Sequence, residues 1–197
     1  MSEAELWDDR YREKPLLWSA EPNRFVAAEL ANLAPGSAVD VACGEGRNSV
    51  WLAERGWRVT GVDFSSVALE RAHAMAAERR VEVEWIQADV LSWQPALAFD
   101  LVVLAYVHLL PDDRDRLMEK ATGWVAPGGH LFVVGHDIST VGVSGPPDPR
   151  LLWDPQTAAA AAAPLEVIFC ERRYRDIEAG RAADTVLLAR ARERREP

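Results

Sequence analysis

The chain has 197 residues, a formal net charge of −9 and two cysteines. This length is typical of one domain with one hydrophobic core. The negative charge disfavours a general affinity for nucleic acid or for an anionic membrane, because phosphates are bound by an excess of Lys and Arg. Cys43 and Cys170 are too few for a disulfide framework and lie too far apart for a metal-ligand motif.

The first residues, MSEAELWDDRYREK, mix acids and bases and lack the apolar core of a signal peptide. The longest apolar run, LVVLAYVHLL, is shorter than the roughly 20 residues that span a bilayer. We therefore expect a cytoplasmic protein that makes no contact with a membrane.

Strand-like and helix-like segments alternate from residue 37 onward. Strands are predicted at 37–43, 57–63, 81–89, 99–106 and 130–137, separated by helices at 47–56, 65–80 and 112–125. A loop with two Gly and three Pro follows at 138–150, then a helix at 154–163 and two strands, 165–175 and 183–192, close enough to form an antiparallel hairpin. The alternation predicts an α/β protein with a doubly wound sheet and helices on both faces.

The segment VDVACGEGRNS, residues 39–49, predicts a ligand site after the first strand. Ligands of doubly wound sheets bind beyond the carboxyl ends of the strands, and Gly44 and Gly46 would let the backbone approach such a ligand closely. The helix that begins near Arg47 would add unpaired N–H groups. A dinucleotide site would have a third glycine where this chain has Ser49, so the fingerprint is incomplete.

Acidic residues lie at the ends of three successive predicted strands. Asp40 precedes the glycines, Asp63 ends the second strand and Asp89 ends the third. An acidic rim suits a cationic, sulfonium-bearing adenosyl cofactor better than a pyrophosphate. Each feature also has an ordinary explanation: Asp63 as a helix cap, Asp89 as a turn residue and the glycines as a simple turn. A nicotinamide-dependent oxidoreductase and a non-catalytic adenosyl-binding module are the alternative functions.

The ordered motifs VDVACGEGRNS, GWRVTGVDFS, IQADV, FDLVVLAYVHL and APGGHLFVVGHD resemble those of class I S-adenosylmethionine-dependent methyltransferases over residues 37–137. Together with WDDRYREKPLLWSAEPNRFV near the start, they are similar to the bacterial tellurite-resistance and thiopurine-type methyltransferases. The resemblance implies a seven-stranded, mostly parallel sheet of order 3-2-1-4-5-7-6 with strand 7 antiparallel. It also implies one methyltransferase domain over 1–197, with an N-terminal arm or lid at 1–30, a cofactor-binding core at 37–137, a substrate-side loop at 138–153 and a C-terminal helix and hairpin at 154–190.

Carried over by position, the resemblance implies that Asp63 binds the ribose hydroxyls and that Asp89 and the Val90 N–H bind the adenine edge. Ala42 stands where many relatives have a second glycine. The residues expected to bind S-adenosyl-L-methionine are Trp18, Asp40, Ala42, Gly44, Gly46, Asn48, Asp63, Phe64, Asp89, Val90 and Ala105.

Methyl transfer from a sulfonium by in-line displacement needs mainly alignment, and a base only where the acceptor must lose a proton. His108 and Tyr106, after the fourth strand, are the expected catalytic residues. His136 and Asp137 could join His108 in a metal set, although the expectation is that no metal is bound. We expect the methyl acceptor to be a small-molecule thiol, oxyanion or hydroxyl, and we expect no nucleic-acid partner. The protein is expected to be a monomer or a homodimer.

Overall fold

The computed structural model describes residues 3–14, 16–17, 19–178 and 180–193. The strands form one seven-stranded sheet in the order β3-β2-β1-β4-β5-β7-β6, which confirms the predicted fold class. The chain divides into two compact units, Met1–Gln94 and Pro95–Pro197, which are taken in turn. Within the described ranges, no helix is long and apolar enough to cross a membrane.

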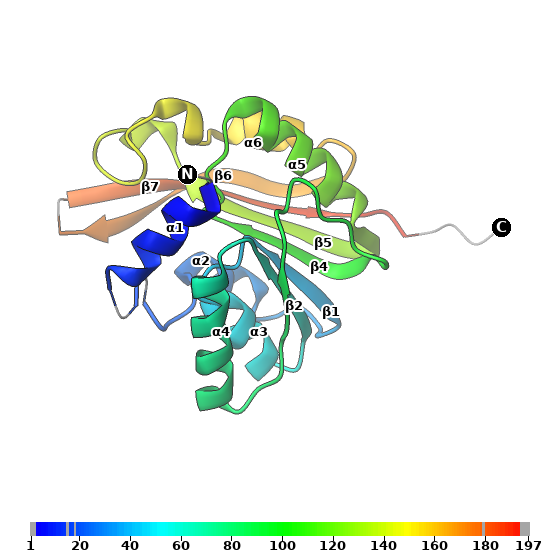
Figure 1. Ribbon diagram of the computed structural model, residues 1–197. Helices are drawn as coiled ribbons and strands as arrows, with labels where there is room; N and C mark the ends of the chain where they lie inside the picture. The colour runs from blue at the N-terminus through cyan, green and yellow to red at the C-terminus, as the bar shows by residue number, and fades with distance from the viewer. Residues whose placement is uncertain (1–2, 15, 18, 179, 194–197) are drawn as a thin grey trace. The chain divides into compact units, whose positions relative to one another are not determined.

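The first unit has three parallel strands with two helices packed against them. Strand β1 pairs with β2, and β2 pairs with β3, both in parallel. Helices α3 and α4 lie side by side along these strands (Figure 1), and α1 contacts α4. The elements are α1 (Glu3–Arg12), α2 (Arg24–Leu30), β1 (Ser37–Val41), α3 (Arg47–Glu54), β2 (Arg58–Asp63), α4 (Ser66–Arg79) and β3 (Glu84–Gln87).

Local chemistry explains where these elements begin and end. The Ser65 hydroxyl accepts a hydrogen bond from the Ala68 N–H and caps α4, at the start of the helix predicted over 65–80. Strand β3 is shorter than the predicted 81–89 because both ends of that stretch are used elsewhere. The Val81 N–H donates to the Ala76 carbonyl at the end of α4, and the Asp89 carbonyl accepts from Trp93 in a turn. The two N-terminal helices were not predicted from sequence.

The second unit combines parallel and antiparallel pairing. Strand β4 pairs in parallel with β5, whereas β7 pairs antiparallel with both β5 and β6, so the predicted hairpin and antiparallel last strand are confirmed. Helices α5 and α6 contact each other and lie over one face of these strands (Figure 1). The elements are β4 (Phe99–Ala105), α5 (Pro111–Gly123), β5 (Val125–His136), η1 (Ile138–Thr140), η2 (Pro149–Leu151), α6 (Pro155–Ala161), β6 (Glu166–Ile177) and β7 (Gly180–Arg190).

Strand β5 begins earlier than the sequence predicts, at Val125 rather than at His130. The APGG turn therefore belongs to the strand, and the pairing with β4 shifts register between Phe99 and Leu101. Gly129 permits this close approach, because a Cβ there would lie 2.9 Å from the Asp100 carbonyl oxygen and 3.0 Å from the Phe99 one. The irregularity is thus a β-bulge that requires glycine.

Candidate functional site

The glycine loop that joins β1 to α3 has a left-handed backbone. The φ angles are 55° at Ala42, 55° at Gly44 and 79° at Gly46. Gly46 is the N-cap of α3 and has no side chain to satisfy the helix amides. Backbone N–H groups at the start of such a helix can bind a ligand carboxylate. The geometry fits the sequence-based prediction of a ligand loop at this place.

Asp63 holds the glycine loop in position from the end of β2. Its Oδ2 accepts a hydrogen bond from the Gly44 N–H at 2.8 Å, and its Oδ1 accepts from the Ser65 N–H at 2.9 Å. Burial raises the pKa of the Asp63 carboxyl, although these backbone hydrogen bonds oppose the rise. Because each carboxylate oxygen can accept more than one hydrogen bond, both oxygens retain acceptor capacity for ligand hydroxyls.

Asp40 lies on β1 and is 1% exposed. Its Oδ2 accepts a hydrogen bond from the Ser49 hydroxyl at 2.6 Å. Burial raises the pKa of Asp40 to about 6, and the nearby charge of Asp63 adds to this effect, while Ser49 opposes it. The same environment raises the pKa of the buried Cys43 thiol, which therefore stays protonated at neutral pH. Two electrostatically destabilised carboxylates in one unit favour a nearby positive charge.

The two glycines of the loop face protein atoms closely. A Cβ on Gly46 would lie 2.5 Å from the Trp85 ring and 2.8 Å from the Ala72 Cβ, and one on Gly44 would lie 2.8 Å from the Tyr11 hydroxyl. Trp85 in turn packs against a buried apolar cluster that includes Met75. Packing against neighbouring side chains therefore accounts for these glycines in addition to any close approach by a ligand.

Residues before α3 are tied directly to the glycine loop. The buried Glu45 carboxylate accepts from the Leu17 N–H, at 3.1 and 3.0 Å to its two oxygens, and from the Arg71 guanidinium at 2.7 Å. The Asn48 Oδ1 accepts from the Asn23 N–H at 2.8 Å. The N-terminal segment is thus anchored on the loop by hydrogen bonds to side chains that the loop and α3 supply.

A second anchor joins α1 to the start of α4. The Asp8 Oδ1 accepts a hydrogen bond from the Ser65 hydroxyl at 2.5 Å and from the Val67 N–H at 3.4 Å. An acidic side chain at a helix N-terminus is favourable because it faces unpaired N–H groups. Asp8 therefore caps a helix that lies beside it in space but 57 residues away in the chain.

In the second unit, aromatic and charged side chains gather where β4 and β5 end. The rings of Tyr106 and His136 have centroids 4.6 Å apart, and the rings of His108 and His136 stack at 5.4 Å with an interplanar angle of 5°. Tyr106 is a non-glycine residue with φ of 59°. A strained backbone of this kind is common at functional sites.

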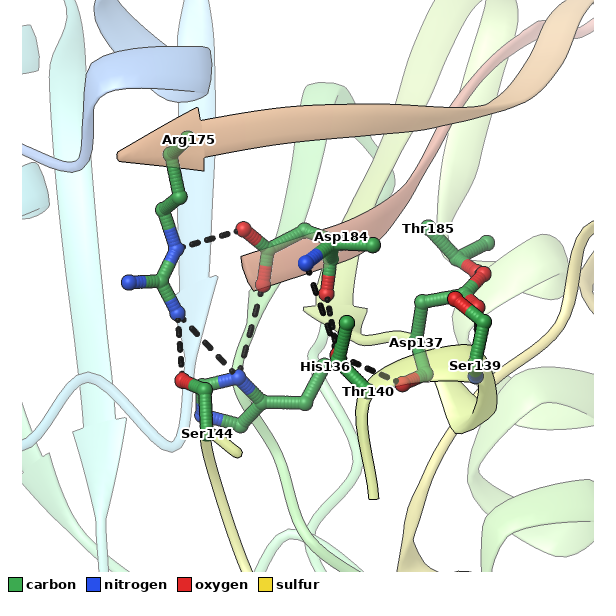
Figure 2. Close-up of polar contacts among 9 residues, drawn as sticks. His136, Asp137, Ser139, Thr140, Ser144, Arg175, Asp184 and Thr185 are labelled. Carbon is green, nitrogen blue, oxygen red and sulfur yellow. Dashed lines mark hydrogen bonds and ion pairs between the residues drawn. The ribbon is translucent and has the colours of Figure 1, made fainter. Parts of the chain in front are cut away.

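Figure 2 shows the polar partners of His136. The Arg175 Nε donates to the Asp184 Oδ2 at 2.6 Å, and an Arg175 Nη2 donates to the Ser144 hydroxyl at 2.9 Å. The His136 Nδ1 lies 3.4 Å from the Asp184 Oδ1. Asp184 is fully buried on β7, so its carboxylate is held in place by these neighbours.

Residues 38–129 match the family model described as "Methyltransferase domain". This stretch of the chain is therefore similar to a methyltransferase domain. It is 33% identical over 133 residues to trans-aconitate 2-methyltransferase of an Azoarcus species, an alignment that covers 64% of this chain and 49% of that protein. The chain spans about half the length of the curated relatives that it matches.

Solved structures with the same fold include two proteins of less than 25% identity. The N-methyltransferase NodS of Bradyrhizobium japonicum, solved with S-adenosyl-L-homocysteine, has a TM-score of 0.75 at 20% identity and covers 98% of this chain and 100% of its own. TehB of Haemophilus influenzae has a TM-score of 0.73 at 16% identity, with 86% and 62% covered. These likenesses show that the chain has the same fold as these two proteins.

The remaining predicted cofactor residues have varied environments. In the first unit, Phe64 is half-buried, Asp89 is exposed and Val90 is buried. The Asp89 Oδ1 accepts from the Leu91 N–H at 2.8 Å, so this residue also serves the turn that follows β3. Ala105 is the last residue of β4 in the second unit. Trp18 lies outside the described residues.

Asp137, a member of the alternative metal set, has other partners in the structure. The Asp137 carboxylate accepts hydrogen bonds from the Ser139 N–H at 2.9 Å, the Thr185 hydroxyl at 2.7 Å and the Arg172 Nε at 2.7 Å. Burial alone would raise the pKa of Asp137, but these hydrogen bonds outweigh it and lower the pKa. Across the described part of the chain, no group of three or more His, Cys, Asp or Glu side chains is placed to hold a metal ion.

Several residues that shape the site were missed from sequence. Glu45 lies between the two glycines, where an acid could have been noted, but its partners Leu17 and Arg71 belong to distant segments. Asp184 interrupts the apolar run of β7, which is a signal for a buried charge with a specific partner. The partners of Glu45 and of Asp184 could not be identified without the tertiary structure.

Proposed function

We propose that this chain is an S-adenosyl-L-methionine-dependent methyltransferase that transfers a methyl group to a small-molecule acceptor by in-line displacement. The observation that carries the proposal is the buried pair Asp40 and Asp63, both of raised pKa, beside the left-handed glycine loop of a methyltransferase domain. Their charges are stabilised by a cationic ligand and would repel a pyrophosphate.

In this proposal the residues of the first unit each contact one part of the cofactor. Asp63 accepts hydrogen bonds from the ribose hydroxyls, and the backbone of Gly44 and Gly46 lies against the methionine part, with Asp40 nearby. Phe64 packs on the adenine, whose edge is bound by Asp89 and the Val90 N–H. Ala42 and Asn48 complete this set in the first unit, and the resemblance adds Trp18 and the Ala105 backbone to the residues expected to bind the cofactor.

The bound cofactor supplies an activated methyl group, so the protein has to bind, orient and exclude water. Tyr106 and His108 of the second unit are proposed to line the acceptor side, with the 139–150 loop. A small acceptor is supported by the name of the trans-aconitate 2-methyltransferase relative. The net charge of −9 argues against nucleic acid as the acceptor.

Calorimetric titration with S-adenosylmethionine, S-adenosylhomocysteine and NADH tests the proposal. We expect both adenosyl ligands to bind and NADH to give no heat above dilution. Binding of NADH with no response to either adenosyl ligand would contradict the proposal and favour an oxidoreductase.

Two variants sharpen this test. Asp63→Asn should weaken S-adenosylmethionine binding by roughly 10- to 100-fold, because one charged hydrogen bond to a hydroxyl contributes about 1.5–3 kcal/mol. Glu70→Gln on the exposed face of α4 is the matched control and should leave the affinity unchanged. Equal affinities for the wild type and Asp63→Asn would remove the ribose assignment.

The pH dependence provides an independent check. Because the pKa of Asp40 is raised to about 6, the carboxylate loses its charge as the pH falls through this value. S-adenosylmethionine should therefore bind more weakly at pH 5 than at pH 8, and Asp40→Asn should remove most of that difference. The same calorimetric titration at both pH values measures it.

A further inference from the structure

Tyr11 is a buried side chain that none of the expected cofactor contacts uses. It lies on α1 in the first unit and is 4% exposed, whereas its neighbours Arg10 and Arg12 are exposed. A Cβ added to Gly44 would lie 2.8 Å from the Tyr11 hydroxyl oxygen and 3.8 Å from the ring carbon that carries this oxygen. The hydroxyl, rather than the ring, therefore meets the glycine loop.

We infer that Tyr11 is a further cofactor-binding residue, whose hydroxyl donates a hydrogen bond to the α-carboxylate of S-adenosyl-L-methionine. The inference rests on the proposed function and adds a side-chain donor where the backbone of Gly44 and Gly46 lies against the methionine part. All residues that carry the inference belong to the first unit.

The first step of the argument is that the N-terminal segment holds Tyr11 in place. Asp8 lies three residues before Tyr11, on the same side of α1, and accepts a hydrogen bond from the Ser65 hydroxyl at the start of α4. Beyond the helix, the Leu17 N–H donates to the buried Glu45 carboxylate, at 3.1 and 3.0 Å to its two oxygens. The segment that carries Tyr11 is therefore tied to the rest of the first unit on both sides of this residue.

The second step is the environment of Gly44. Its φ is 55°, and its N–H donates to the Asp63 Oδ2 at 2.8 Å. The Tyr11 hydroxyl approaches the same residue at the α-carbon, where any other residue type would place its Cβ. A carboxylate acceptor and a hydroxyl donor thus meet the loop at one residue, so the two groups can bind different parts of one ligand.

The third step is the charge of the methionine part, which carries an ammonium, a sulfonium and a carboxylate. Asp40 and Asp63 favour the cationic groups, but the carboxylate needs hydrogen-bond donors. Backbone N–H groups at the start of α3 are one source, because its N-cap, Gly46, has no side chain to satisfy them. A phenol keeps its proton at neutral pH, so the Tyr11 hydroxyl at Gly44 is a second source, two residues before that N-cap.

Packing alone does not require the hydroxyl of Tyr11. A phenylalanine at this position would fill the same space and would leave the ring in ordinary contact with Gly44. A buried tyrosine hydroxyl is favourable only with a hydrogen-bond partner, and a charged acceptor makes a hydrogen bond roughly twice as strong as a neutral one. A structural role and a cofactor-binding role therefore differ in their dependence on the ligand carboxylate.

A ligand-free measurement tests the placement of the hydroxyl. Gly44→Ala should lower the midpoint of urea denaturation, because φ is positive and because the new Cβ would meet the Tyr11 hydroxyl. In a Tyr11→Phe background the ring carbon at 3.8 Å is in ordinary contact, so the same substitution should lower the midpoint by less. Equal shifts in the two backgrounds would remove the hydroxyl from Gly44 and overturn the inference, whether or not a ligand binds.

Calorimetric titration with S-adenosylmethionine and with decarboxylated S-adenosylmethionine tests the ligand contact. The two ligands share the sulfonium and the amine and differ only in the carboxylate. Tyr11→Phe removes the hydroxyl and keeps the ring. We expect this variant to weaken S-adenosylmethionine binding by about 10- to 100-fold and to change the affinity for the decarboxylated ligand by less than about threefold.

Tyr174→Phe is the matched control, because it removes the same hydroxyl from a side chain that is 48% exposed on β6, and it should change neither affinity. Equal losses for both ligands in Tyr11→Phe would show a merely structural role and overturn the inference, as would no loss for either ligand. Wild-type protein that binds neither ligand would contradict the proposed function as well. Binding of both ligands by the wild type, with equal losses in Tyr11→Phe, would overturn this inference alone.

Discussion

Replacing Gly46 by alanine should destabilise the protein through two separable effects. The first is conformational: φ is 79° at Gly46, and an L-residue in the left-handed region costs about 1–2 kcal/mol. The second is steric, because the added Cβ would lie 2.5 Å from one Trp85 ring atom and 2.8 Å from the Ala72 Cβ. Overpacking of this kind typically costs about 1–3 kcal/mol, so the expected loss is about 2–5 kcal/mol.

Gly56→Ala is the matched control. Its φ is 87°, but the nearest atoms to an added Cβ are those of Pro35 at 3.8 and 3.9 Å, which is ordinary contact. The control should therefore lose only the conformational part, about 1–2 kcal/mol. Both glycines belong to the first unit, so the two variants report on the same part of the fold.

Urea denaturation followed by tryptophan fluorescence measures the free energy of unfolding of both variants. A double-mutant cycle with Trp85→Leu isolates the contact with the ring, since in that background Gly46→Ala should cost less than in the wild type and keep only the conformational part and the contact with Ala72. Equal losses for the two alanine variants, or an unchanged loss in the Trp85→Leu background, would refute the view that packing against Trp85 requires glycine at 46.

Two further predictions concern the same loop. Burial raises the pKa of Asp40 from 3.8 to about 6, so ionisation of this carboxyl opposes folding. The free energy of unfolding therefore falls as the pH rises from 3.8 to about 6. The total loss is about 3 kcal/mol, at about 1.4 kcal/mol per pKa unit. Asp40→Asn should match the wild type at pH 4 and exceed its free energy of unfolding by about 2–3 kcal/mol at pH 8; a constant difference in urea denaturation at the two pH values would contradict this. Asn48→Ala removes the acceptor of the Asn23 N–H and should increase the rate of limited proteolysis before α2 several-fold. The control Glu70→Gln should leave that rate unchanged. Equal cleavage rates for the two variants would show that this hydrogen bond does not anchor the segment.

The strand and helix pattern was predictable because it depends on local periodicity and capping. The strands β1, β2 and β4 and the starts of α4 and α6, capped by Ser65 and Asp154, lie close to where the sequence predicts strands and helices. The predicted strand at 81–89 was too long, because the end of α4 and a turn use the residues at its two ends. The predicted start of β5 was wrong, because a β-bulge brings the APGG residues into the strand. Such boundaries depend on neighbours in space.

The sequence by itself determined the α/β class, the glycine loop and the three acids at strand ends, because these follow from residue type and spacing along one segment. It did not reveal that Ser49 donates to Asp40, that Trp85 packs on Gly46, or that Asp184 faces His136. Those pairs join segments that are distant in the chain, and their geometry depends on strand register and helix packing. Only the tertiary structure could therefore decide which carboxylates are buried, what partners they have and how their pKa values respond.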